Sequence, residues 1–332
     1  MNPVEQPTAT DVLGRIAKYL DQDVCQVKAL LHDLIHTDSK LIEDVGEYLN
    51  LASGKMLRPK LLLLIARAFG GPGRSAPIGI AAAMEAIHVA TLLHDDVIDG
   101  GNVRRGQQSV NARWGSDVAI LMADYLYAAS FELAISKLDP RPLQLICEVT
   151  RRMCEGEIYQ IERRRQWLTH EDYLYIITCK TARLFSACAA LGATHAGLGE
   201  EAVTQVTGFG LNFGMAFQIT DDTLDYTARE GQLGKPAGLD LASGKQTLPL
   251  ILAMRDASPE DLARIRELLD GGKDPRQIRE FIDRYHAIDN AIAQAGEYAA
   301  GAAAHLEGIP VRDPEAFGHL QALTRYVVRR QA

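Results

Sequence analysis

An Asp-Asp-x-x-Asp pattern occurs in residues 92–106, LLHDDVIDGGNVRRG, and again in residues 217–226, FQITDDTLDY. Residues four apart on a helix lie on one face, about one turn from each other. Asp95 and Asp99 therefore point the same way, and the same holds for the second copy. Because like charges at this spacing mildly destabilise a helix, each cluster is expected to have a cationic partner.

The positions of the two clusters point to a metal. The first cluster precedes two glycines, a predicted helix C-terminus, where carboxylates oppose the helix dipole. Both clusters follow apolar sequence, so we expect them at the mouth of a core-facing groove. Carboxylates on two facing helices, completed by water and phosphate oxygens, suit Mg²⁺. A solvated helix end is the alternative for one cluster alone, and a di-iron bundle would need Glu-x-x-His pairs, which neither cluster contains.

The composition favours helices packed on helices. Hydrophobic residues make up 47% of the 332 residues and aromatic residues only 6%, and Ala and Leu dominate the apolar set. Pro59 opens an apolar run that two glycines close, and Thr169 with Asp172 forms a capping-box pattern. No stretch alternates apolar and polar residues for long enough to indicate a sheet. We therefore predict an all-α fold that forms a single domain over residues 1–332.

Start and stop signals place the predicted elements along the chain. The predicted helices span residues 9–36, 40–50, 59–69, 76–99, 107–136, 141–165, 170–192, 199–228, 244–256, 259–270, 275–304 and 314–330. The Gly-rich, charged stretch over residues 230–245 is expected to join helices rather than domains.

Charge and cysteine usage narrow the class of protein. A net charge of −8 and a pI of about 5.6 argue against a nucleic-acid partner. Five cysteines without a CxxC pair indicate a reducing compartment, so we expect a cytoplasmic protein. The N-terminus does not resemble a signal peptide, and the strongest apolar run, residues 61–66, is too short to span a bilayer. We therefore expect a protein that is not integral to a membrane.

Basic residues near the acidic clusters are candidates for contacts to an anion. These residues are Lys55, Arg58, Arg104, Arg105, Lys180, Lys235 and Lys245. Arginine can chelate a phosphate group bidentately, and lysine acts as a mobile point charge. The alternative for each is a solubilising surface group. Residues 163–165, three consecutive arginines, are expected to form a solvated helix end.

Together, these segments resemble trans-polyprenyl diphosphate synthases, closest in style to the long-chain, octaprenyl-type members. The similar segments are SGKMLRP (53–59), LLHDDVIDGGNVRRG (92–106), EGEIYQ (155–160), CKTARLF (179–185), FQITDDTLDY (217–226) and GKPAGLDLASGKQTLPL (234–250). The resemblance implies a large helical bundle of the isoprenoid synthase type around a central apolar cavity. One departure is Met56, at a position where the family often has a basic residue.

The resemblance also implies a role for each site residue. The implied metal ligands, for three Mg²⁺ ions per active site with substrates bound, are Asp95, Asp99, Asp221, Asp222 and Asp225. The residues implied to contact the allylic diphosphate or its loop are Arg104, Lys180, Thr181, Gln218, Lys235 and Lys245. The residues implied to bind isopentenyl diphosphate are Lys55, Arg58, His88 and Arg105. The implied catalytic residues are Asp95, Asp96, Asp99, Arg104, Lys180, Thr181, Gln218 and Asp221. A satisfied core histidine is the alternative for His88.

The implied reaction condenses isopentenyl diphosphate with an allylic diphosphate. The allylic C–O bond ionises first, while Mg²⁺ and basic residues stabilise the departing diphosphate. The double bond of isopentenyl diphosphate then attacks the allylic cation, and the released diphosphate takes the proton. Dipoles of Thr181 and Gln218 would face the cation, and residues 230–245 would form a lid that excludes water. A homodimer is the family's usual assembly.

Small side chains before the first cluster predict a long product in the octaprenyl range. Ala90 and Ala86 would line a tunnel for the growing chain, where many short-chain relatives have an aromatic floor. Tyr127 or Phe131 could form a deeper floor, and Ala-rich spacing would also permit close helix packing alone. A farnesyl or geranylgeranyl synthase is the alternative product class. A terpene cyclase and a non-catalytic prenyl-diphosphate-binding subunit are the alternative functions.

The first prediction concerns this tunnel. Ala90→Phe is expected to shorten the product, because a bulky ring would block a chain that grows past this position. Chromatography of the products checks the prediction, and an unchanged chain length would contradict it.

Overall fold

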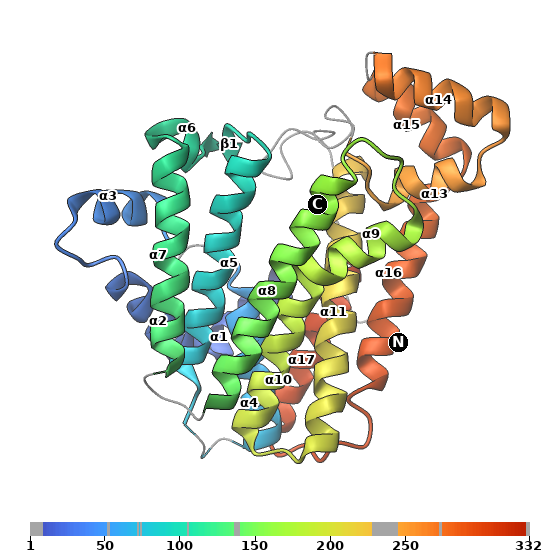
Figure 1. Cartoon of the computed structure of the whole chain (residues 1–332). Helices are drawn as coiled ribbons and strands as arrows, with labels where there is room; N and C mark the ends of the chain where they lie inside the picture. Colours follow the sequence, from blue (N-terminus) through green and yellow to red (C-terminus); the bar gives the residue numbers. More distant parts are fainter. Residues whose placement is uncertain are drawn as a thin grey trace.

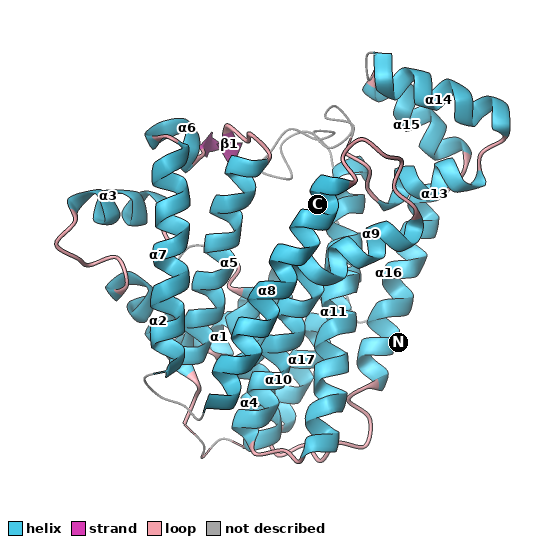
Figure 2. Cartoon of the chain, in the orientation of Figure 1, coloured by secondary structure: helices cyan, strands magenta, loops and turns pink. Residues whose placement is uncertain are grey.

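The computed structural model describes residues 9–51, 54–71, 73, 75–104, 106–135, 140–227, 245–271 and 274–329. Helices dominate these residues, as Figure 2 shows, and the prediction of an all-α fold is confirmed. The described helices are α1 (Ala9–Tyr19), α2 (Asp21–Asp33), α3 (Lys40–Leu49), α4 (Leu57–Gly70), α5 (Ile78–Ile98), α6 (Val110–Trp114), α7 (Ser116–Ile135), α8 (Pro140–Glu162), α9 (His170–Ile177), α10 (Arg183–Ala196), α11 (Glu200–Thr227), α13 (Leu248–Asp256), α14 (Pro259–Gly271), α15 (Pro275–Arg284), α16 (Ala287–Ala304) and α17 (Pro314–Arg329).

Two short elements were not predicted. A π-helix, η1 (Thr178–Ala182), joins α9 to α10. A two-stranded antiparallel hairpin, β1 (Val103–Arg104) and β2 (Gln107–Gln108), follows α5. The capping box that the sequence predicts at the start of α9 is confirmed, since Thr169 and Asp172 exchange side-chain and backbone hydrogen bonds.

Backbone breaks divide some predicted helices. The predicted helix over residues 275–304 is α15 followed by α16, because His286 adopts a left-handed conformation with φ 50° between them. The predicted helix over residues 107–136 begins as β2 and α6, and Gly115 with φ 97° separates α6 from α7. Glycine accepts such a conformation readily, whereas a histidine there is held by its surroundings.

The centre of the bundle consists of α4, α5, α10 and α11, whose small side chains allow close packing. Ala81, Ala82 and Ala83 of α5 are fully buried. In α11, a Cβ atom added at Gly214 would lie 2.5 Å from Cα of Ala182 in η1. Only glycine permits this approach, so Gly214 sets how closely α11 lies against the π-helix.

Both acidic clusters lie at the same end of the bundle. Figure 1 shows that α5 and α11 direct their C-terminal ends to the end at which β1 and α13 lie. The helices α14 and α15 project beyond α13, to one side of the main bundle. The fold positions the site because α5 and α11 both end, with their acidic clusters, at the same end of the bundle.

In the part of the chain that the structure describes, three helical stretches are long and apolar enough to span a membrane, judged by length and composition alone. They are Ile78–Ile98, Ser116–Ile135 and His170–Ala196. In the bundle, most of the first and the third is buried, but only 39% of the second. The helix α7 therefore presents an apolar outer face.

A pair of glycine substitutions tests the packing of α11. Gly214→Ala is expected to destabilise the protein, although alanine is normally favoured over glycine in a helix by about 1 kcal/mol. The added methyl group would meet the backbone of Ala182. Gly318→Ala in α17 is the matched control, because a Cβ atom there meets nothing within 4 Å and should stabilise. Urea unfolding of both variants checks this, and equal gains in stability would contradict it.

Candidate active site

A cavity of about 790 Å³ lies where the ends of α5 and α11 approach each other, and α4, α8, α9 and η1 complete its walls. Both acidic clusters reach this cavity. The predicted site residues that line it are Arg58, His88, Asp95, Asp99, Arg104, Lys180, Thr181, Gln218, Asp221, Asp222 and Lys245. The fold thus gathers carboxylates and cations that are distant in sequence around one space.

Some predicted site residues lie elsewhere. Asp96 and Asp225 are buried and do not line this cavity. Lys55 is exposed and donates a hydrogen bond of 3.4 Å to a tyrosine hydroxyl of α17. Outside the described residues lie Arg105, Lys235 and residues 230–244 of the predicted lid.

In the first acidic cluster, Asp95 faces the cavity and Asp96 binds an arginine. Burial raises the pKa of Asp95 to about 6, although nearby Lys180 opposes the shift. An ionised carboxylate at Asp95 is therefore unfavourable unless more positive charge comes close. Asp96 turns to Arg104, whose Nε donates to both carboxylate oxygens at 2.9 and 2.7 Å. This pair holds the guanidinium of Arg104 at the rim of the cavity.

In the second cluster, Asp221 lines the cavity and Asp222 accepts hydrogen bonds from neighbouring side chains. The hydroxyl of Tyr173 donates to Oδ2 of Asp222 at 2.7 Å, and Nε2 of Gln218 donates to its Oδ1 at 3.0 Å. Gln218 in turn accepts a hydrogen bond of 2.8 Å from the hydroxyl of Thr181. Asp222 therefore orients a chain of dipoles along the cavity, whereas Asp221 is exposed and lines it.

The π-helix η1 carries Lys180 and Thr181 into the cavity together. Single π-turns inserted in α-helices are frequent at functional sites, because they turn adjacent side chains toward one space. Lys180 forms an ion pair with Glu157 of α8 and donates a hydrogen bond of 3.1 Å to Gln160. Two residues of α8 thus hold the ammonium group in place.

A buried cation, Arg58, is among the residues that line the cavity. The guanidinium carbon of Arg58 lies 4.6 Å from the centroid of the Phe185 ring. Burial lowers the pKa of Arg58, and the negative charge of Glu85 opposes this shift. A cation that is poorly hydrated in this way favours an anionic ligand.

A smaller cavity of about 200 Å³ continues from the main one between α5, α7 and α8. Thr91, Asp95 and Lys180 line both spaces, and Tyr127 lines the smaller one. Ala90 and Ala86 are fully buried and line neither cavity. At about 100° per residue, Ala90 lies roughly 140° around the helix from Asp95, whereas Thr91 lies only about 40° away. Of these residues, Thr91 is therefore the one that lies on the Asp95 face of α5 and lines both cavities.

Several residues of the cavity wall were missed in the sequence. They include Thr91, Gln160, Arg163, Arg164, Tyr173, Phe217 and Gln246. Arg164 and Arg165 are exposed, as expected of a solvated helix end, and Arg163 is half-buried, but Arg163 and Arg164 also line the cavity, which the sequence did not predict. Three consecutive arginines were a signal, but the sequence could not show that the turn after α8 faces α5.

The carboxylates of the cavity offer hard oxygen donors for a divalent cation. Among the described residues, no group of three or more His, Cys, Asp or Glu side chains could hold a metal ion by itself. Asp95, Asp99 and Asp221 nevertheless line one space, so phosphate oxygens of a ligand could complete a shared coordination.

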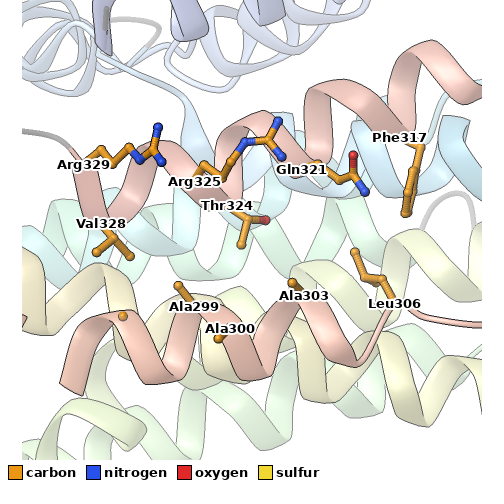
Figure 3. Close-up of a pocket in the computed structure, with 11 residues that line it drawn as sticks. Ala299, Ala300, Ala303, Leu306, Phe317, Gln321, Thr324, Arg325, Val328 and Arg329 are labelled. Atoms are coloured by element: carbon orange, nitrogen blue, oxygen red, sulfur yellow. The ribbon is translucent and has the colours of Figure 1, made fainter. Parts of the chain in front are cut away.

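Another groove, of about 340 Å³, lies between α16 and α17 (Figure 3). Alanines of α16 face Thr324 and Val328 of α17 across it, and Phe317 and Leu306 close one end. Among the described residues, none of the predicted site residues and no carboxylate lines this groove. The chemistry of the molecule is therefore assigned to the cavity between α5 and α11.

An all-α bundle whose acidic helix ends and inward cations surround a cavity is characteristic of enzymes that act on prenyl diphosphates. The family model of the polyprenyl synthetases matches residues 39–285, and the chain belongs to this family. The protein is accordingly a prenyltransferase that elongates polyprenyl diphosphates.

Named relatives cover both product classes. The chain is 36% identical over 302 residues to the octaprenyl diphosphate synthase of Escherichia coli (strain K12), covering 90% of this chain and 93% of the relative. It is 33% identical over 329 residues to a short chain isoprenyl diphosphate synthase of Methanothermobacter thermautotrophicus, covering 97% and 99%. A solved polyprenyl synthase from Caulobacter crescentus CB15, complexed with calcium and isoprenyl diphosphate, superposes with a TM-score of 0.89 at 34% identity, covering 96% of this chain and 98% of that one.

Removal of one hydroxyl tests the dipole chain. Tyr173→Phe is expected to lower the free energy of unfolding by about 1–3 kcal/mol, because the buried Asp222 loses one of its donors. Condensation should slow as well, since Asp222 then holds Gln218 less firmly. Denaturant unfolding and single-turnover kinetics check this. Tyr298→Phe is the control, because no hydrogen bond of that hydroxyl is found among the described residues; equal effects of the two variants would contradict the role.

Proposed function

We propose that this chain condenses isopentenyl diphosphate with an allylic diphosphate in a magnesium-dependent reaction that gives a long, octaprenyl-like product. The observation that carries the proposal is the meeting of two acidic helix ends and several cations over a cavity with an apolar extension. The complex of the Caulobacter relative with calcium and isoprenyl diphosphate supports a divalent metal and this substrate class.

The metal would be held by Asp95, Asp99 and Asp221, which reach the cavity. The residues fit such an ion, because burial makes the charge of Asp95 unfavourable until a cation approaches. Asp222, which lines the same cavity, is proposed as a further ligand, and Asp225, which is buried outside its lining, as a residue that supports the second cluster, with three Mg²⁺ ions per site. When bound, Mg²⁺ supplies Lewis-acid stabilisation of the departing diphosphate.

The chain's own groups bind, orient and exclude water. Lys180 and Arg104 line the cavity, are each held by a carboxylate partner, and are proposed to contact the allylic diphosphate. Arg58 and His88 also line it and are proposed to bind the diphosphate of the second substrate. As the allylic C–O bond breaks and the new C–C bond forms, the dipoles of Thr181 and Gln218 face the cation. The released diphosphate takes the proton lost from the condensed chain.

The apolar wall supports a long product. Leu92, Ile177 and Phe217 line the main cavity, and Ile158 and Met153 extend the apolar surface into the smaller one. Two side chains of α5, Thr91 and Asp95, line both cavities. A small residue at the position of Thr91 leaves the passage open for a growing prenyl chain.

The outer face of α7 supports a homodimer. Leu121 is 68% exposed and Ile135 is 61% exposed, and Ile158 and Ile161 of α8 are also exposed. Large apolar side chains exposed on neighbouring helices favour an interaction surface, and a second copy of the chain is the proposed partner. We also propose a cytoplasmic location outside the membrane and without nucleic acid, supported by the net charge of −8.

The decisive experiment measures pyrophosphate release by the purified full chain with Mg²⁺, labelled isopentenyl diphosphate and each allylic starter. Release that needs both substrates, together with labelled polyprenyl product, is the expected result. Release from the allylic substrate alone would instead identify a cyclase. Asp95→Asn and Asp221→Asn should each abolish product, whereas a chelator should abolish it reversibly.

Product length is tested by neighbouring substitutions. Thr91→Phe is expected to shorten the product, because the ring would enter the passage shared by both cavities. Ala90→Phe should instead destabilise the fold by about 1–3 kcal/mol through overpacking, since Ala90 is fully buried. Product chromatography and thermal unfolding distinguish the two. Shortening by Ala90→Phe but not by Thr91→Phe would show that the chain grows along another path.

A further inference from the structure

Arg164 bridges two walls of the cavity at its mouth. It follows α8, and its Nη2 lies 3.2 Å from Oδ1 of Asp99 and 3.2 Å from the backbone carbonyl oxygen of Ile98. Both acceptors belong to the C-terminal end of α5, where the helix dipole also favours a cation. The guanidinium therefore already supplies a positive charge to Asp99, a proposed metal ligand.

The neighbouring arginines do not share this position. Arg163 is held by an ion pair of 3.2 Å to Asp172 and lies over the ring of Tyr159. Arg165 is exposed and does not line the cavity. Arg164 thus combines a place in the cavity wall with a contact to one proposed metal ligand.

The bridge is readily broken. The side chains of Arg164 and Asp99 are 45% and 55% exposed, and ion pairs with such exposure contribute little to stability. The turn that carries Arg164 is fixed by backbone hydrogen bonds, including Arg164 N to the carbonyl oxygen of Ile161 at 3.2 Å. The side chain can therefore leave Asp99 while its backbone stays beside the cavity.

We propose that Arg164 is a resident counter-cation of Asp99 that is exchanged on substrate loading. In the substrate-free chain it neutralises Asp99 and competes with a divalent cation there. When metal and diphosphate enter, Arg164 releases Asp99 and binds diphosphate oxygens, which a planar guanidinium contacts well. No bond to carbon forms or breaks in this exchange. The inference rests on the proposed function, because it takes Asp99 as a metal ligand.

The exchange predicts two effects of opposite sign for Arg164→Gln in the full-length protein. Mn²⁺ should bind the substrate-free variant about two- to fivefold more tightly than the wild type, since its competitor is gone. Inorganic diphosphate, added with Mg²⁺, should bind about two- to tenfold more weakly, since one guanidinium contact is lost. Paramagnetic resonance of free Mn²⁺ measures the first quantity, and calorimetry measures the second.

Arg165→Gln is the matched control, because it removes the same charge one residue away and should leave both affinities within a factor of about 1.5. The proposal stands only if Arg164→Gln shows both changes and the control shows neither. Equal changes in the two variants, the loss of either effect, or the absence of Mn²⁺ binding in all proteins overturns it. Product formation by the wild type is assayed alongside: without product the proposed function fails, and with product only the exchange fails.

Discussion

The structure depends on holding like charges together in a space that is poorly hydrated. Asp95 and Asp221 are brought to one cavity by two helices that end on the same rim. Burial already penalises the charge of Asp95, so the arrangement lowers stability by itself and gains from any cation that enters. In each cluster the middle aspartate reduces this electrostatic repulsion, because it pairs with a neighbouring side chain. Asp96 holds Arg104 and Asp222 holds Gln218, so fewer carboxylates face one another across the opening.

Acidic side chains hold the lysine, the amide and the hydroxyl group that line the cavity. Glu157 holds Lys180, and Asp222 orients the amide that meets the hydroxyl of Thr181. Close packing makes these contacts reproducible. Because Gly214 admits the backbone of Ala182, the π-helix lies directly against α11, and the side chains of both elements share one wall. The close packing of α11 against the π-helix therefore also determines where the charged side chains lie.

Composition and spacing were enough to predict the helical fold, the shared direction of Asp95 and Asp99, and the capping box of α9, because these follow from local periodicity. What failed depends on contacts between distant segments. The break at His286 is a left-handed residue that local propensity does not favour. The wall role of Arg164 follows from how the end of α8 meets the end of α5. Spacing alone also did not show which side of α5 lines the two cavities, which is the side of Thr91 rather than that of Ala90.

Because the chain is negatively charged overall, positive charge near the cavity is needed to attract an anionic substrate. At −8, the chain repels an approaching diphosphate at long range, and it does so most strongly at the acidic rim. A diphosphate that arrives with divalent cations carries less negative charge, so the rim attracts the complex where it would repel the bare anion. Lys180 lines the same cavity, and so does the buried Arg58, whose poor hydration strengthens its attraction for phosphate. Under the proposed function, this arrangement of carboxylates and cations would favour a metal-bound diphosphate over a bare one, and the apolar space beside Thr91 would receive the attached prenyl chain.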